Sequence, residues 1–168
     1  MRMTMKVAMT ITMPATTAEL PDALFRVPDN TRPGHTIYDY AELLSSIPGF
    51  KNVNVIEYPL LNYGQELRIT AYTHLSRIIA NADNINDTLR SGKPSYSTGK
   101  PIRLNIFDAD NPYLPPLPNN FPGIFELDDG HHRVAQALRN KHYWLDAVIH
   151  SEFNDEPYET PYYQFPAL

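Results

Sequence analysis

The sequence predicts an α+β fold in a single domain, and three observations lead to this prediction. A chain of 168 residues is long enough for one domain with a real core and too short to expect two. Runs that are β-rich or alternate in polarity are interspersed with segments whose apolar residues recur every three to four positions, the periods of strands and helices. The stretch 124–140 joins both kinds of element through one tight turn.

The first 35 residues are expected to form a strand and then an irregular arm. Between Met3 and Met13, apolar residues alternate with Thr, Lys and Ala, which is the period of a half-buried strand. All five methionines lie within residues 1–13, so the segment could also be an adaptable contact surface. We favour the strand. Residues 14–33 have no sustained periodicity and indicate an irregular connection.

A helix and a strand are expected to open the domain proper, residues 36–150. Thr36 and Asp39 have the spacing of a shortened capping box, which predicts a helix beginning after Thr36. Val53–Leu61 is rich in residues that favour strands.

Gly64–Asp83 carries the longest helical pattern of the chain. Its apolar residues recur at spacings of four, four, three and four, which predicts a helix: Leu67, Ala71, Leu75, Ile78 and Ala82. A short helix is expected after it, around Ile85–Leu89.

Strands are also expected at Pro101–Phe107 and Trp144–His150, on either side of the strand–turn–helix. The loop 108–123 contains NPYLPPLPNN and is far longer than a connection between strands requires. It could be a spacer, a lid or a ligand for a partner protein. The tail, 151–168, combines prolines with aromatic residues and is expected to pack onto the domain or onto a partner.

The turn at Gly130 is followed by a dense set of hydrogen-bond donors. Glycine permits a tight reversal, after which His131, His132 and Arg133 occupy the first turn of the helix. Free backbone N–H groups and the positive end of the helix dipole make such a turn an anion site. Imidazole and guanidinium donors suit it to phosphate. In the simpler alternative, an aspartate caps the helix and the histidines are only solvated; the cost of three such residues in helix propensity favours the functional interpretation.

The run Asp129-Gly130-His131-His132-Arg133-Val134-Ala135 resembles the D-G-H-H-R-x-A box of the ParB/sulfiredoxin superfamily, which binds nucleotide phosphates at a helix start. The resemblance covers roughly residues 53–149, and the box is its one sharp motif. It implies a ParB/sulfiredoxin-like mixed small sheet packed with helices, to which the N-terminal strand would be an addition.

The resemblance also implies roles for residues of the box. Arg133 and His132 would be direct phosphate ligands, helped by Gly130 and His131, and losing Arg133 should weaken binding by roughly one to two decades. Asp129 could hold Mg²⁺ together with the phosphates, and it could equally cap the helix.

Two residues outside the box are further candidates. Glu66 resembles the acidic base of the free-serine kinases of the superfamily, although a glutamate in the first turn of a helix often only compensates the dipole. Arg68 could be a second phosphate ligand or a surface charge. The catalytic candidates are therefore Glu66, Asp129 and His131.

Several classes of protein are excluded or disfavoured. Sulfiredoxins carry a cysteine at the position of His131, so sulfinic-acid repair is excluded. Classical chromosome partition is not expected either, because ParB proteins of that class follow the box with a helix-turn-helix domain and a dimerisation domain. The absence of cysteine also removes disulfides and thiolate catalysis and is consistent with a reducing compartment. No H-x-x-x-H pair supports a zinc hydrolase. No run is long enough to span a membrane, so a cytoplasmic location is expected by default.

Three functional hypotheses follow. The first is an enzyme that binds ATP or another nucleoside triphosphate with Mg²⁺ and hydrolyses it or transfers its terminal phosphoryl group to a small hydroxyl acceptor. The second is a ParB-like nuclease or DNA-binding protein of plasmid or phage origin, which the net charge of −5 and the pI near 5.6 disfavour. The third is a non-catalytic interaction or inhibitor protein, which would use the methionine strand, the proline-rich loop or the aromatic tail.

Overall fold

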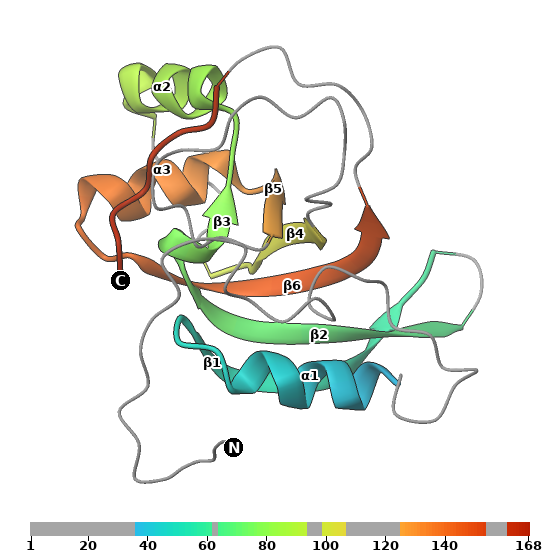
Figure 1. Cartoon of the computed structure of the whole chain (residues 1–168). Coiled ribbons are helices and arrows are strands. Elements are labelled where there is room, and N and C mark those ends of the chain that lie inside the picture. Colours follow the sequence, from blue (N-terminus) through green and yellow to red (C-terminus); the bar gives the residue numbers. More distant parts are fainter. Residues whose placement is uncertain (1–35, 62–63, 94–98, 107–124, 154–160) are drawn as a thin grey trace, which may run out of the picture.

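The computed structural model of the chain describes residues 36–61, 64–93, 99–106, 125–153 and 161–168. The expected N-terminal strand and arm and the proline-rich loop lie outside the described residues. Within them the fold is α+β, as the sequence predicts: a six-stranded mixed sheet packed with three α-helices (Figure 1).

In chain order, the elements are α1 (Ile37–Ser45), β1 (Phe50–Pro59), β2 (Gln65–His74), a 3₁₀ turn η3 (Leu75–Arg77), β3 (Ile78–Ile79), α2 (Ala82–Ser91), β4 (Ile102–Ile106), β5 (Phe125–Asp129), α3 (His131–Arg139) and β6 (Trp144–Phe153). The strand order in the sheet is β1-β2-β6-β4-β5-β3. Antiparallel pairs join β1 to β2, β2 to β6 and β4 to β5, whereas β4 runs parallel to β6 and β3 parallel to β5. Strand β4 thus separates the strand that leads into α3 from the strand that follows it.

The expected helix starts and strands are largely present. The capping box before α1 is confirmed, because the Thr36 hydroxyl accepts from the Asp39 N–H and the Asp39 carboxylate accepts from the Thr36 N–H, each at 3.2 Å. Helix α2 is longer than expected, with Asn81 as its N-cap and Gly92 in the left-handed conformation at its end. The strands expected near 53, 101, 124 and 144 correspond to β1, β4, β5 and β6.

The prediction of a helix over Gly64–Asp83 is wrong, because most of this segment forms β2, η3 and β3. A spacing of four is even as well as close to the helical period, so Leu67 and Ala71 also share one face of a strand. The alternation of burial decides the outcome, because Ile69 and Ala71 are buried whereas Arg68, Thr70 and Tyr72 are only partly buried. Strand β2 pairs on both sides, with β1 and with β6, and this tertiary pairing overrides the local helical pattern.

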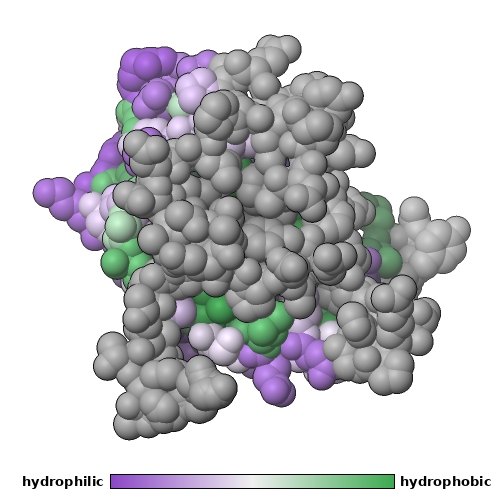
Figure 2. Space-filling model, in the orientation of Figure 1, coloured by the Kyte–Doolittle hydropathy of each residue, from purple (hydrophilic) through white to green (hydrophobic). Residues whose placement is uncertain are grey.

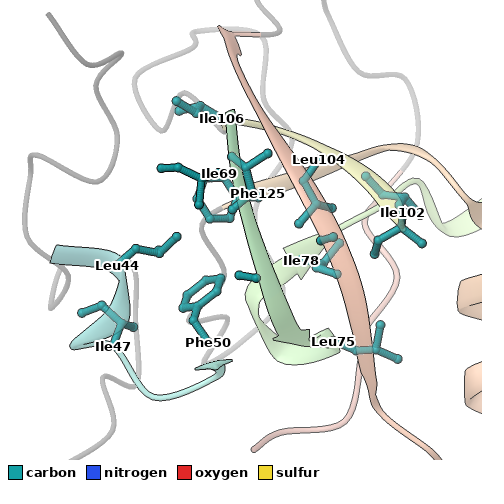
Figure 3. Packing of buried hydrophobic residues seen from close by; sticks show 14 of the residues in the cluster. Leu44, Ile47, Phe50, Ile69, Leu75, Ile78, Ile102, Leu104, Ile106 and Phe125 are labelled. Atoms are coloured by element: carbon teal, nitrogen blue, oxygen red, sulfur yellow. The ribbon is translucent and has the colours of Figure 1, made fainter. Parts of the chain in front are cut away.

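The core lies on one face of the sheet, between the strands and the helices. Figure 3 shows side chains from α1, β1, β2, β4 and β5 meeting there. Phe50 and Phe125 make an edge-to-face contact with ring centroids 5.8 Å apart. The largest fully buried apolar side chains are Phe125, Leu44, Leu75, Ile78, Ile79, Ile85, Ile102, Leu104 and Ile106.

The end of the described chain runs back along the domain. The Tyr163 N–H donates to the Ala80 carbonyl and the Ala82 N–H donates to the Pro161 carbonyl, each at 2.9 Å, and Tyr162 is buried. Hydrophilic side chains cover the outer ends of α2 and α3 (Figure 2, upper left). No helix in the described part of the chain is both long and apolar enough to cross a membrane.

Candidate functional site

The turn between β5 and α3 requires a glycine at position 130. Gly130 has a φ of 117°, a conformation that side chains with a β-carbon rarely adopt. A Cβ built there would lie 2.6 Å from Cγ2 of Ile102, at the start of β4. The turn is therefore tight against β4, and the chain can pass from β5 into α3 only without a side chain at this position.

Helix α3 begins at this turn without a side-chain cap. Gly130 is its N-cap residue, and among the described residues no side chain accepts a hydrogen bond from the first-turn N–H groups. The alternative role for Asp129, as the cap, is wrong. The Asp129 carboxylate instead faces Arg133 Nη2 at 3.4 Å, and its side chain is 61% exposed. Within the part of the chain that the structure describes, no carboxylate caps the positive end of the helix dipole.

Arg133 is fixed by the main chain of the segment that leads into β4. Its Nη1 donates to the Lys100 carbonyl at 2.7 Å and to the Pro101 carbonyl, and only 11% of its side chain is exposed. A guanidinium bonded in this way holds the start of α3 against the start of β4. Arg133 is therefore a residue that builds the turn, and phosphate contact would have to use its remaining donors.

The two histidines of the turn differ in environment. His132 is exposed, whereas His131 is half-buried. Burial lowers the pKa of His131, and His132 lowers it further, while the nearby Asp129 and Asp128 raise it in part. His131 is therefore neutral at pH 7 and can accept a proton.

Glu66 and Arg68 lie on β2, on the sheet face opposite the core. Glu66 was expected in the first turn of a helix, and this position is wrong because Gln65–His74 is a strand. Its Oε2 accepts from Arg68 Nε and faces Arg68 Nη2, both at 2.7 Å. The Arg68 guanidinium also lies over the Tyr58 ring, 4.1 Å from its centroid.

Arg68 is linked across the sheet to Arg103 through one imidazole. Arg68 Nη1 lies 3.0 Å and Arg103 Nε 3.3 Å from the same atom, Nε2 of His150. Guanidinium groups only donate, so Nε2 must accept, and the imidazole is the neutral tautomer with its proton on Nδ1. Arg103 Nη2 in turn forms an ion pair with Asp128 Oδ2 at 3.1 Å.

These contacts form a polar row from β2 through β6 and β4 to the end of β5, beside the Gly130 turn: Glu66, Arg68, His150, Arg103 and Asp128. The row contains two of the residues predicted from the sequence, Glu66 and Arg68, and ends one residue before Asp129. The sequence-based prediction missed His150 and Arg103 as members of a site. The alternation of β4 places Arg103 opposite Ile102 and Leu104, but the strand order that brings it next to β6 has no local signal.

The described residues offer a metal ion at most one or two protein ligands at this site. Among the described residues, no group of three or more His, Asp, Glu or Cys side chains is placed to hold a metal ion. Mg²⁺ in phosphate sites usually takes one or two carboxylates and completes its shell with water and phosphate oxygens. The exposed Asp129 fits that requirement, whereas Asp128 is engaged by Arg103.

Comparison of the chain with protein-family models, with curated proteins and with solved structures gave no match.

Proposed function

We propose that the protein binds the phosphates of a nucleotide at the start of α3, with Mg²⁺, and hydrolyses the nucleotide or transfers its terminal phosphoryl group to a small hydroxyl acceptor. The single observation that carries the proposal is the uncapped start of α3 at Gly130, where Asp129 faces Arg133 and leaves the first-turn N–H groups to another acceptor. Such a helix start favours an anion. The resemblance of the Asp129–Ala135 box to the ParB/sulfiredoxin superfamily supports phosphate as that anion.

The donors around the turn receive distinct roles in this proposal. The backbone N–H groups of the first turn and the exposed His132 contact phosphate oxygens. Arg133 holds the turn against β4 and offers its remaining donors. Arg103, whose side chain is 45% exposed beside the end of β5, supplies a second guanidinium. Two fixed cations and a helix start stabilise the charge that develops on the transferred phosphoryl group.

Proton transfer is assigned to His131. The oxygen of water or of the acceptor hydroxyl forms a bond to the terminal phosphorus, the bond from that phosphorus to the nucleoside diphosphate breaks, and the hydroxyl proton passes to the neutral imidazole of His131. Asp129 would hold Mg²⁺, which when bound neutralises phosphate charge. Glu66 is the weaker base, because Arg68 engages its carboxylate and it stands at the end of the polar row that is away from the turn.

The test is a calorimetric titration of ATP, CTP and ADP with Mg²⁺ into wild type, His132→Ala and Arg90→Ala. His132 is exposed, so its loss should leave the fold intact and weaken nucleotide binding by about tenfold or more if its imidazole contacts phosphate. Arg90 is an exposed arginine of α2 that pairs with Asp87, and its variant is the control for the loss of one cation. Absence of binding for all three nucleotides to the wild type would refute the proposal.

A further inference from the structure

A pocket lies along α3, on the side that faces the start of β6, and Arg133 of the box is one of its lining residues. It encloses about 240 Å³ and is lined by one stripe of α3, by the segment before β4 and by the start of β6. A pocket of this volume can hold several water-sized groups, so it has room for a small metabolite.

The polar side chains that line the pocket come from segments far apart in the sequence: Lys100, Arg133, Gln136, Asn140, His142 and Asp146. Arg133 and Gln136 of α3 and its C-cap residue Asn140 follow the helical repeat, so they form one stripe along the helix. Strand β6 and the segment at 99–100 complete the other walls. Figure 1 shows α3 lying beside the first part of β6, as this arrangement requires.

Two opposite charges line this pocket without neutralising each other. Lys100 and Asp146 are both exposed, and neither forms an ion pair within the described residues. In the same region the other charged groups are engaged, as Arg133 is by the carbonyls of Lys100 and Pro101. A cation and an anion on the walls of one small pocket match a ligand that carries a negative group at one end and a hydrogen-bond donor at the other.

We infer that this pocket binds a small organic anion that also bears a hydroxyl or ammonium group, with the anionic group at Lys100 and the donor at Asp146. Asn140 and Gln136 also line the pocket, and their amide groups can hydrogen-bond to the body of the ligand. The inference does not depend on nucleotide binding at Gly130, because the contacts assigned to the ligand use Lys100 and Asp146, which lie outside the box, although Arg133 also lines the pocket.

The chain contains a built-in reporter for this pocket. Trp144 is its single tryptophan, and the ring stacks on Tyr72 with centroids 5.5 Å apart. The Tyr72 hydroxyl lies 2.9 Å from His142 Nε2, and His142 lines the pocket. A ligand that contacts His142 should therefore change the environment of Trp144 and its fluorescence.

The experiment titrates three probes at millimolar concentration: sn-glycerol 3-phosphate, 4-aminobutyrate and propanoate. Trp144 fluorescence and ligand-observed saturation-transfer NMR are read in parallel, so that a fluorescence-silent complex is still detected. Propanoate carries an anionic group without a hydroxyl or ammonium group. It should therefore bind more weakly than whichever of glycerol 3-phosphate and 4-aminobutyrate binds. If only the phosphate probe binds, the ligand is a hydroxylated phosphate; if only the amine probe binds, it is a zwitterionic carboxylate.

Two variants test the assigned contacts. Lys100→Ala should lower the affinity for the probe by about tenfold to a hundredfold, because it removes one charge-assisted hydrogen bond. Asp146→Asn keeps an acceptor and loses the charge, so it should weaken the ammonium probe much more than the hydroxyl probe. Lys93→Ala and Glu42→Gln remove exposed charges elsewhere and should leave every affinity unchanged.

The inference is overturned if neither glycerol 3-phosphate nor aminobutyrate gives a signal by either method, or if binding is the same in Lys100→Ala and Asp146→Asn as in wild type. His132→Ala separates it from the proposed function. That variant should weaken nucleotide binding and leave probe binding unchanged, so the failure of one site is distinguishable from the failure of the other.

Discussion

The guanidinium of Arg133 is bound to the main-chain carbonyl of Lys100, with Nη1 and the carbonyl oxygen 2.7 Å apart, although the two residues are 33 positions apart in the sequence. The same nitrogen also donates to the Pro101 carbonyl. A guanidinium is a fixed, permanently charged donor, so these bonds hold α3 and the approach to β4 in one arrangement. The arginine of the predicted phosphate box thus has a structural role that its place in the motif does not reveal.

We therefore expect Arg133→Ala to destabilise the fold as well as weaken nucleotide binding. Losing hydrogen bonds from a charged, largely buried donor should cost about 1.5–3 kcal/mol, which lowers the midpoint of thermal unfolding by roughly 3–12 °C. Arg133→Lys keeps the charge and loses the fork of donors, so it should recover only part of the stability. Arg90→Ala is the matched control on an exposed helix, and it should change the midpoint little. An unfolding midpoint equal to that of wild type for Arg133→Ala would contradict the structural role.

Gly130→Ala should be more damaging than the same substitution at Gly99. The alanine would adopt an unfavourable φ and place its Cβ 2.6 Å from Cγ2 of the buried Ile102. Backbone strain and overpacking together should cost roughly 2–5 kcal/mol, measured by urea unfolding. Gly99→Ala is the control for strain alone, because its φ is +90° and nothing lies within 4 Å of a Cβ there, so it should cost about 1–2 kcal/mol.

The double variant Gly130→Ala with Ile102→Ala, which removes Cγ2 of Ile102, separates the two causes. If the clash with Cγ2 dominates, the smaller neighbour reduces the cost of the alanine relative to its cost in wild type. If the cost is the same in both backgrounds, the close approach of Gly130 and Ile102 does not explain the need for glycine.

Local chemistry was readable from the sequence, and pairing between distant segments was not. The start of α1 could be predicted because Thr36 and Asp39 satisfy backbone groups within one helical turn. The turn at Gly130 and the helix after it were predictable for the same reason. Residues 65–74 could not be assigned from local spacing, because apolar residues four apart lie on one face of a strand as well as of a helix, and the strands on both sides of β2 decide between the two.

The candidate site follows the same division. His131 and His132 were identified from their place after Gly130, which depends on a few adjacent residues. His150 and Arg103 belong to the polar row only because β4 lies between β5 and β6, an order that no short motif encodes. Polar residues at alternate positions of β4 and β6 were the available signal, and they indicate a face without naming the neighbouring strand.

Stability should fall in mild acid because of His74, whose side chain is buried. Burial lowers its pKa below 6.5, and the nearby Arg77 and Lys51 lower it further. The unfolded chain therefore takes up a proton as the pH drops through 6.5, at a pH where the folded protein does not. The free energy of unfolding should be constant above about pH 7 as far as this residue is concerned, and should decrease as the pH falls from 6.5 toward the lower, folded-state pKa.

The matched variant is His74→Asn. His74 Nδ1 accepts from the Ser76 N–H at 3.1 Å at the start of η3, and an asparagine oxygen can replace that acceptor without titrating. Urea unfolding at pH 5, 6, 7 and 8 should give a shallower pH dependence for the variant, even if its stability is lower throughout because the ring contacts with Trp144 are lost. The pH dependence of the unfolding free energy that remains in the variant is expected from His131, whose pKa is also lowered by burial. Parallel curves for the two proteins would refute the assignment.

The two arginines of the polar row should differ in what their loss affects. Arg103 is 45% exposed and pairs with Asp128 beside the Gly130 turn, whereas Arg68 is 14% exposed and packs over Tyr58. Arg103→Gln should therefore weaken nucleotide binding by about tenfold or more with little loss of stability, because an exposed ion pair contributes about 0–1 kcal/mol. Arg68→Gln should lower stability and change affinity less, because it removes a packed guanidinium and leaves His150 with one donor fewer. Calorimetry with ATP and Mg²⁺, paired with thermal unfolding of both variants, distinguishes the two effects. If Arg103→Gln binds nucleotide as tightly as wild type, the phosphate lies away from the end of the polar row, and the turn amides and His132 must hold it alone.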